Sequence, residues 1–168
     1  CIEAVPSDCQ ELSVTVDYHT EVLGRQTATL RSGDDAEKEL AGCRTFCFLH
    51  EIWPLIQHNL IKGGSLDNAI VYVAQPLKTE EKRKIADFFK VQDIGVDKKT
   101  GILSNTQQQF DNEAARHKLL DLLGDLRLLG MPLQAKVTAY SPGHSANTRF
   151  AIELYRYLET HPNLIHTK

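Results

Sequence analysis

Residues 116–126, "RHKLLDLLGDL", constrain the fold of this chain more than any other stretch. At about 100° per residue of helix, His117, Asp121 and Asp125 fall within one narrow stripe. Leu119, Leu123 and Leu126 lie on roughly the opposite side. A helix with an apolar face of this kind must bury that face against another layer of structure. We therefore expect a helix that packs on a sheet or on other helices.

Two interpretations of the polar stripe are open from the spacing alone. A helix at the surface normally turns its polar stripe to water. A histidine and a carboxylate one turn apart can instead bind one metal ion, as His117 and Asp121 are spaced to do. Asp125, one turn further on, can orient a neighbouring group, and a plain surface acid is its simpler interpretation.

The length and composition of the chain indicate an ordinary globular domain. Its 168 residues suggest one domain, or one compact domain with an insertion. Apolar residues make up 42% and charged residues 24%, which is enough for a buried core. The net charge of −3 argues against a broad nucleic-acid or membrane footprint, and no apolar run is long enough for a transmembrane segment.

The first residues, "CIEAVPSDCQ", contain no basic start, no apolar leader and no initiator methionine. We expect a fragment of a longer, cytoplasmic protein. The four cysteines, Cys1, Cys9, Cys43 and Cys47, form no CxxC pair. Reduced thiols are the simplest interpretation.

Strand and helix patterns alternate along the chain. Alternating and β-branched segments predict strands at 11–18, 25–31, 69–73 and 133–140. Helical spacing predicts helices at 45–60, 78–90, 112–130 (the longest) and 141–159. This mixture predicts an α+β fold, a two-layer sandwich of a mainly antiparallel sheet packed on helices.

Two other positions carry side chains suited to catalysis. His144 in "SPGHSAN" lies at a strand-to-helix turn, where a histidine can serve as general acid or electrostatic stabiliser, or simply as a cap. Gly143 beside it is expected to provide backbone freedom. Thr45 in "CRTFCF" can donate its hydroxyl to an oxyanion, although a helix N-cap is its simpler role.

Four motifs in fixed order carry a resemblance to a known family: "TFCFLHEI", "IKGGSLDNAIV", "RHKLLDLLGDL" and "SPGHSAN". Together they resemble the second half of the UDP-3-O-acyl-N-acetylglucosamine deacetylases, zinc enzymes of lipid A biosynthesis in Gram-negative bacteria. The similarity runs over residues 12–159. The sequence also resembles the Bacteroidetes type of the enzyme, which is fused to a 3-hydroxyacyl-acyl-carrier-protein dehydratase.

The resemblance implies a two-domain enzyme with its active site between the domains. Residues 1–160 would form the second domain and 161–168 a tail or linker, with the first domain absent from this chain. A small inserted βαβ-like unit would line a passage for the acyl chain. The first domain and a fused dehydratase are the protein partners that the resemblance suggests.

The resemblance also implies a role for individual residues. His117 and Asp121 would bind Zn²⁺, and His144 would stabilise the oxyanion and help protonate the leaving amine. Asp125 would orient His144, and Thr45 would donate to the oxyanion.

Other residues match substrate-binding positions of the family. Lys118 would contact the nucleotide-sugar part of the substrate. Phe46 and the segment 48–69, with Gly64 and Ser65, would line the acyl passage. Cys47 stands where the family often has glycine, which bears on the acyl-chain preference.

The implied reaction is hydrolysis of the N-acetyl group of UDP-3-O-(3-hydroxyacyl)-N-acetylglucosamine to a free amine and acetate. A further histidine ligand and a glutamate base would come from the first domain, so we expect this chain alone to be inactive or nearly so. A metal-free α+β interaction module, related in fold only, is the alternative. A complete zinc hydrolase that uses His50 or His58 as third ligand is a second one, and it predicts tight zinc binding by the chain alone.

Overall fold

The computed structural model describes residues 1–168 except 59, 62, 64, 104–106 and 165–168. The chain divides into two compact units. The first unit comprises Cys1–Val16, Gln26–Gly42 and Ala115–Lys168, and the second comprises Asp17–Arg25 and Cys43–Ala114.

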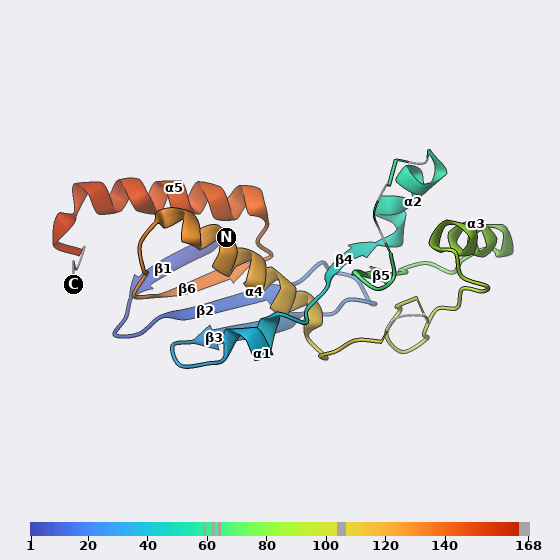
Figure 1. The fold of residues 1–168 in the computed structure, drawn as a ribbon, viewed down its shortest axis with the longest axis horizontal. Coiled ribbons are helices and arrows are strands. Elements are labelled where there is room, and N and C mark those ends of the chain that lie inside the picture. Colours follow the sequence, from blue (N-terminus) through green and yellow to red (C-terminus); the bar gives the residue numbers. More distant parts are fainter. Residues whose placement is uncertain (59, 62, 64, 104–106, 165–168) are drawn as a thin grey trace. The chain divides into compact units, whose positions relative to one another are not determined.

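The first unit contains a four-stranded sheet in the order β1-β6-β2-β3 (Figure 1). Its strands are β1 (Ile2–Pro6), β2 (Glu11–Val16), β3 (Gln26–Arg31) and β6 (Ala135–Tyr140). The pairs β1–β6 and β2–β3 are antiparallel, and only the central pair β2–β6 is parallel. The predicted, mainly antiparallel sheet is confirmed, and the edge strand β1 is an addition to it.

One face of this sheet is apolar and the other is polar. On β2 and β6 every second residue is buried, and these residues are Leu12, Val14, Val16, Ala135, Val137 and Ala139. The opposite face carries cross-strand hydroxyl pairs, with 3.0 Å between the oxygens of Ser13 and Thr29. Such alternation is typical of a sheet covered on one side only.

Helices α1 (Ala36–Leu40), α4 (Glu113–Leu126) and α5 (His144–Thr160) complete the first unit, and Figure 1 shows α4 and α5 running along the sheet. The buried leucines of α4 are Leu119, Leu122 and Leu126. Helix α4 has 14 residues and α5 has 17, so the expectation that the helix at 112–130 is the longest was wrong. Its last residues tighten into the 3₁₀ turn η1 (Arg127–Leu129), and Gly130 ends that turn with φ 70°.

The second unit is built on a βαβ arrangement, as the inserted unit was expected to be. Strands β4 (Thr45–Phe48) and β5 (Ala69–Tyr72) are parallel and are joined through α2 (Leu49–Gln57). Helix α3 (Thr79–Phe89) follows β5. A core of buried apolar residues holds these elements together, and it includes Leu49, Ile56, Val71, Ile85 and Leu103.

The helix predicted from Thr45 begins later than expected. Residues 45–48 pair with β5 as a strand, and α2 starts only at Leu49. "TFCF" is rich in aromatic and β-branched residues, which fit a pleated surface better than a helix. Pro54 lies inside α2 and does not end it.

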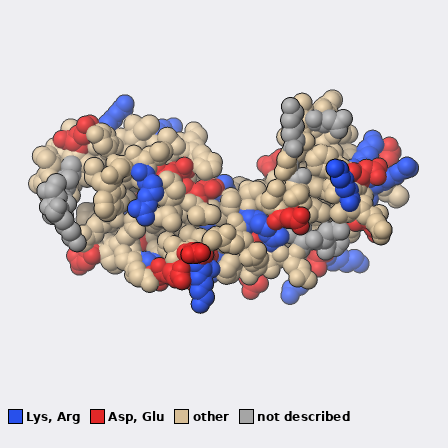
Figure 2. Space-filling view, in the orientation of Figure 1, with Lys and Arg blue, Asp and Glu red and all other residues tan. Residues whose placement is uncertain are grey.

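Charged side chains of both signs are interspersed on the face shown in Figure 2. This distribution agrees with the small net charge of −3. Within the described residues, no helix combines the length and apolar character needed to cross a membrane.

Candidate functional site

The polar stripe of α4 is not left in water. The side chains of His117, Lys118, Asp121 and Asp125 are only 18%, 19%, 12% and 17% exposed. Carboxylates are rarely this buried without partners, and Asp121 and Asp125 both have them. The stripe is therefore partly buried and paired, and it is not simply solvated.

His117 and Asp121 face each other across one turn of α4. The distance from His117 Nε2 to Asp121 Oδ1 is 3.5 Å, which is long for a hydrogen bond. Two donor atoms of one tetrahedral zinc ion lie about 3.4 Å apart, given the usual zinc–nitrogen and zinc–oxygen distances. The pair thus has the chemistry and the spacing of two ligands to one zinc ion.

Lys118 forms an ion pair with the other oxygen of the Asp121 carboxylate. Its Nζ lies 3.0 Å from Asp121 Oδ2. The ammonium group fixes the plane of the carboxylate and directs Oδ1 toward His117. Within the described residues, no group of three or more histidine, cysteine and acidic side chains is placed to hold a metal ion.

His144 meets the same stripe from the start of α5. Its Nδ1 lies 2.9 Å from Asp125 Oδ2, and its Nε2 lies 3.8 Å from Asp121 Oδ1. An ionised carboxylate only accepts hydrogen bonds, so Nδ1 carries the hydrogen in this contact. The His144 side chain is 69% exposed, which leaves its ring accessible to a substrate.

The turn before α5 is fixed by backbone contacts. Ser141 adopts a left-handed conformation, with φ 42°, and its N–H donates to the Thr15 carbonyl at 2.7 Å. Gly143 instead has φ −154° and ψ 162°, an extended conformation open to any residue. The expectation that Gly143 supplies the freedom of this turn was wrong, because the unusual backbone lies at Ser141.

Asn147 also belongs to this cluster, although it was not predicted from the sequence. The residue is fully buried, and its Nδ2 donates to Asp125 Oδ2 at 2.8 Å. Its Oδ1 has no hydrogen-bond partner among the described residues. An unpaired buried amide oxygen costs about 1–3 kcal/mol. The available signal was the spacing of three residues from His144, which places both on one face of α5.

Thr45 and Phe46 lie in the second unit. Thr45 is an exposed residue at the start of β4, and the N-cap of α2 is Phe48. The simpler role considered for Thr45, as a helix cap, was therefore wrong. Phe46 packs edge-on against Tyr18 and Tyr72, with ring centroids 5.5 and 6.1 Å apart.

The segment around Gly64 and Ser65, which was predicted to line the acyl passage, is described only in part. The Ser65 N–H donates to Asn68 Oδ1 at 3.1 Å, which closes a turn before β5. Gly64 lies outside the described residues.

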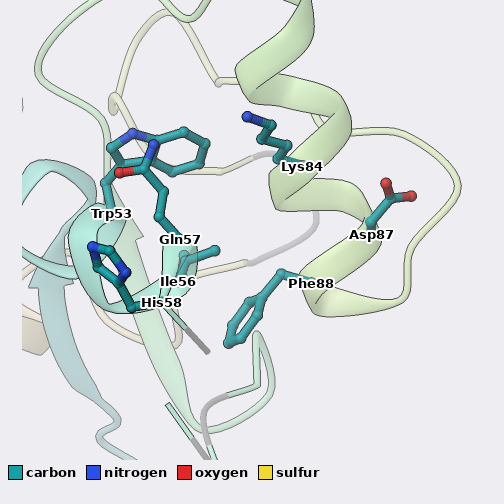
Figure 3. A pocket seen from close by; sticks show the side chains of 7 residues that line it. All are labelled: Trp53, Ile56, Gln57, His58, Lys84, Asp87 and Phe88. Atoms are coloured by element: carbon teal, nitrogen blue, oxygen red, sulfur yellow. The ribbon is translucent and has the colours of Figure 1, made fainter. Parts of the chain in front are cut away.

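A groove of about 640 Å³ lies between α2 and α3 in the second unit (Figure 3). Its walls are formed by Trp53, Ile56, Gln57, His58, Lys84, Asp87 and Phe88. Phe46 and Ser65 are not among these residues. Four of the lining residues, Trp53, Ile56, Gln57 and His58, do lie in the segment 48–69 that was predicted to line the acyl passage, and the passage itself stays a prediction.

Comparison with known proteins decides the family. The sequence profile of the UDP-3-O-acyl N-acetylglycosamine deacetylase family matches residues 1–90 and 85–156. The chain belongs to this family. The resemblance seen in the four motifs is thereby confirmed.

Individual relatives give the same result. The chain is 43% identical over 165 residues to the bifunctional enzyme LpxC/FabZ of Chlorobaculum tepidum, and 38% identical over 160 residues to that of Bacteroides thetaiotaomicron. It is 35% identical over 160 residues to a UDP-3-O-acyl-N-acetylglucosamine deacetylase of Chlamydia pneumoniae.

The matches cover nearly all of this chain but only part of each relative. They include 94% of the chain and 34% of the Chlorobaculum protein, and 94% of the chain and 48% of the Chlamydia protein. The chain thus spans about a third of the bifunctional relatives and about half of the deacetylase.

Proposed function

We propose that this chain is part of an enzyme that hydrolyses the N-acetyl group of UDP-3-O-(3-hydroxyacyl)-N-acetylglucosamine, in the cytoplasmic synthesis of lipid A. Family membership supports the reaction class. The observation that carries the proposal is the separation of 3.5 Å between His117 Nε2 and Asp121 Oδ1, because that distance suits two ligands of one zinc ion.

His117 and Asp121 are the residues that would hold Zn²⁺ in this chain. The ion, when bound, lowers the pKa of a water molecule and polarises the acetyl carbonyl. A third ligand and the glutamate base would come from the first domain of a complete protein. The matched relatives are longer than this chain, which is consistent with a division of the site between two domains.

His144 would handle the proton that the leaving group needs. Asp125 holds the Nδ1–H, so the second nitrogen, Nε2, is the one available to the substrate. As an imidazolium, His144 would donate from Nε2 to the oxyanion when water adds to the carbonyl carbon. It would then pass that proton to the amine nitrogen as the C–N bond breaks, which yields acetate and the free amine.

The remaining assignments follow the resemblance. Thr45 would donate its hydroxyl to the oxyanion, where one fixed donor contributes roughly 3 kcal/mol to the transition state. Lys118 would contact the nucleotide sugar, and Phe46, Gly64 and Ser65 would line the acyl passage. A fused dehydratase domain would follow, as the names of the bifunctional relatives suggest.

Acetate release tests this proposal. The assay uses a chimera in which this chain replaces the matching third of the Chlorobaculum enzyme, which is 43% identical. We expect the parent chimera to release acetate from the UDP-sugar substrate, and His117→Ala or His144→Ala to reduce the rate at least about 100-fold. The matched control is His161→Ala at the end of α5, which should retain the parent rate.

Two results would contradict the proposal. One is a folded, zinc-supplemented chimera in which His117→Ala and His144→Ala are as active as the parent. The other is turnover by the 168-residue chain alone at a rate close to that of the chimera, which would contradict the division of the site between two domains.

A further inference from the structure

Asn147 and His144 both bind the same oxygen of the Asp125 carboxylate. Both lie in the first turn of α5, and Asp125 Oδ2 accepts from Asn147 Nδ2 at 2.8 Å and from His144 Nδ1 at 2.9 Å. Asn147 is fully buried, whereas the His144 side chain is 69% exposed. Asp125 is therefore held from the protein interior by Asn147, and it meets His144 at the surface.

The chemistry of the contact fixes the orientation of the Asn147 amide. An ionised aspartate only accepts hydrogen bonds, so the NH₂ group must face Asp125 and Oδ1 must point away. There Oδ1 has no hydrogen-bond partner within the described part of the chain. Leucine has nearly the same shape, but it would remove both the unpaired oxygen and the hydrogen bond to Asp125.

We propose that Asn147 is a positioning residue that holds Asp125 in the orientation in which Oδ2 receives the Nδ1–H of His144. The consequence is a preferred tautomer of the neutral ring, with the hydrogen on Nδ1 and a free Nε2. This inference rests on the proposed function, in which Nε2 of His144 is the atom that meets the substrate. It adds Asn147 to that site, and it explains why the neutral ring of His144 carries its hydrogen on Nδ1.

The test is ¹⁵N NMR of the histidine rings in the 168-residue chain, without metal or substrate. Spectra of the wild type and of the variants are recorded in the same buffer at the same pH. We expect His144 to carry its hydrogen on Nδ1 in the wild-type chain. In Asn147→Leu, the ratio of the Nδ1–H to the Nε2–H form should fall about tenfold, because one of the two bonds that orient Asp125 is lost.

Stability is measured on the same samples. Asn147→Leu removes an unpaired buried oxygen and also a hydrogen bond to Asp125, so its thermal midpoint serves to show that the variant is folded. Asn147→Ala removes the same donor without adding methyl groups, and it should show the same change of tautomer if the leucine variant does not fold. Combining Asp125→Ala with Asn147→Leu should give no further change beyond that of Asp125→Ala, because both act through one carboxylate.

Ala151→Gly is the matched control. Ala151 is a buried residue one turn further along α5, and it is 2% exposed. Glycine there lowers the stability of the helix without touching Asp125, so the midpoint should fall while the His144 tautomer stays unchanged. An unchanged tautomer in folded Asn147→Leu and Asn147→Ala would overturn the proposal.

The outcome is separable from that of the proposed function. The tautomer is read on the chain itself, whereas acetate release is read on the chimera. A tautomer that depends on Asn147 in a protein without deacetylase activity would keep the positioning role and remove the proposed function. Deacetylase activity in the chimera, together with a His144 tautomer that does not change in the Asn147 variants, would keep the proposed function and remove the positioning role.

Discussion

Cys47 differs from the exposed thiols of this chain in its reactivity. It is partly buried, and burial, with a smaller contribution from the charge of Glu51, raises its pKa to about 11. The thiolate is the reactive form, and only about 1 Cys47 thiol in 3000 is ionised at a pH near 7.5, so Cys47 should react slowly. Cys1 and Cys9 are exposed, whereas Cys43 is buried.

We therefore expect a thiol reagent to label two cysteines quickly in the native chain and all four after unfolding. Mass spectrometry of the labelled peptides identifies them, with Cys9→Ser as the control that should remove one fast site. Labelling of Cys47 at the rate of Cys9 in the native chain would contradict this account of its environment.

At the scale of single residues, the sequence predicted part of the candidate site. The spacing of four residues placed His117, Asp121 and Asp125 on one face of α4, and the structure brings His144 to that face. Asn147 was not predicted, because its role depends on which helix packs beside α5 and on complete burial. Neither property can be read from the residues around it.

At the scale of elements, a buried ion pair within the second unit joins Arg44, the residue before β4, to Glu113. Arg44 Nε lies 2.9 Å from Oε1 of the fully buried Glu113. Burial acts to raise the pKa of Glu113, but hydrogen bonds from Arg44 and from the Gln109 N–H outweigh it and lower that pKa below its ordinary value of 4.5. The pair therefore stabilises the fold when Glu113 is ionised.

Glu113→Gln should reduce the free energy of unfolding by roughly 3–5 kcal/mol near neutral pH, because Arg44 stays buried without its counter-charge. The stability that depends on the lowered pKa is present above about pH 4.5 and is lost as the pH falls through the folded-state value. The wild type should thus lose stability faster than Glu113→Gln in this acid range.

Urea unfolding at several pH values measures both effects. Glu11→Gln is the control, since Glu11 pairs with Arg31 and Lys136 near the surface, at 2.9 Å each. Its substitution should have a smaller effect that added salt weakens further. Equal losses for the two glutamate variants would contradict the account of a buried pair.

Two glycines at the end of α4 should respond to alanine in opposite directions. Gly124 lies within the helix, and an added Cβ would meet nothing within 4 Å, so Gly124→Ala should stabilise the chain by about 0.5–1 kcal/mol. Gly130 has φ 70°, so Gly130→Ala should cost about 1–2 kcal/mol. Calorimetry should show the thermal midpoint rising by a few degrees in one variant and falling in the other. Midpoints that shift in the same direction would show that backbone conformation does not govern these positions.

Periodicity predicted most elements correctly, and tertiary pairing explains the exceptions. The segment 45–60 has helical spacing, yet its first four residues form β4 because β5 lies alongside in parallel register. Strand β1 has weak alternation and becomes a strand through its antiparallel pairing with β6. Such pairings depend on segments more than 20 residues away, which a local pattern does not contain.

At the scale of the whole molecule, the chain matches about a third of the length of the bifunctional relatives. Its described residues include the pair His117 and Asp121, 3.5 Å apart, but no group of three or more donors placed to hold a metal ion. The assignment of residues 1–160 to the second domain stays a prediction. It gives the account its central claim, that this chain carries half of a zinc site.

Zinc binding by the 168-residue chain tests that claim most directly. Titration calorimetry would give the affinity and stoichiometry for the wild type, for His117→Ala, and for the control variants His50→Ala and His58→Ala. We predict one weak site, with an affinity below that of structural zinc sites, whose binding free energies are roughly 10–16 kcal/mol. His117→Ala should abolish it and the two controls should leave it unchanged. Tight binding that survives His117→Ala, or that is lost in His50→Ala or His58→Ala, would contradict the account.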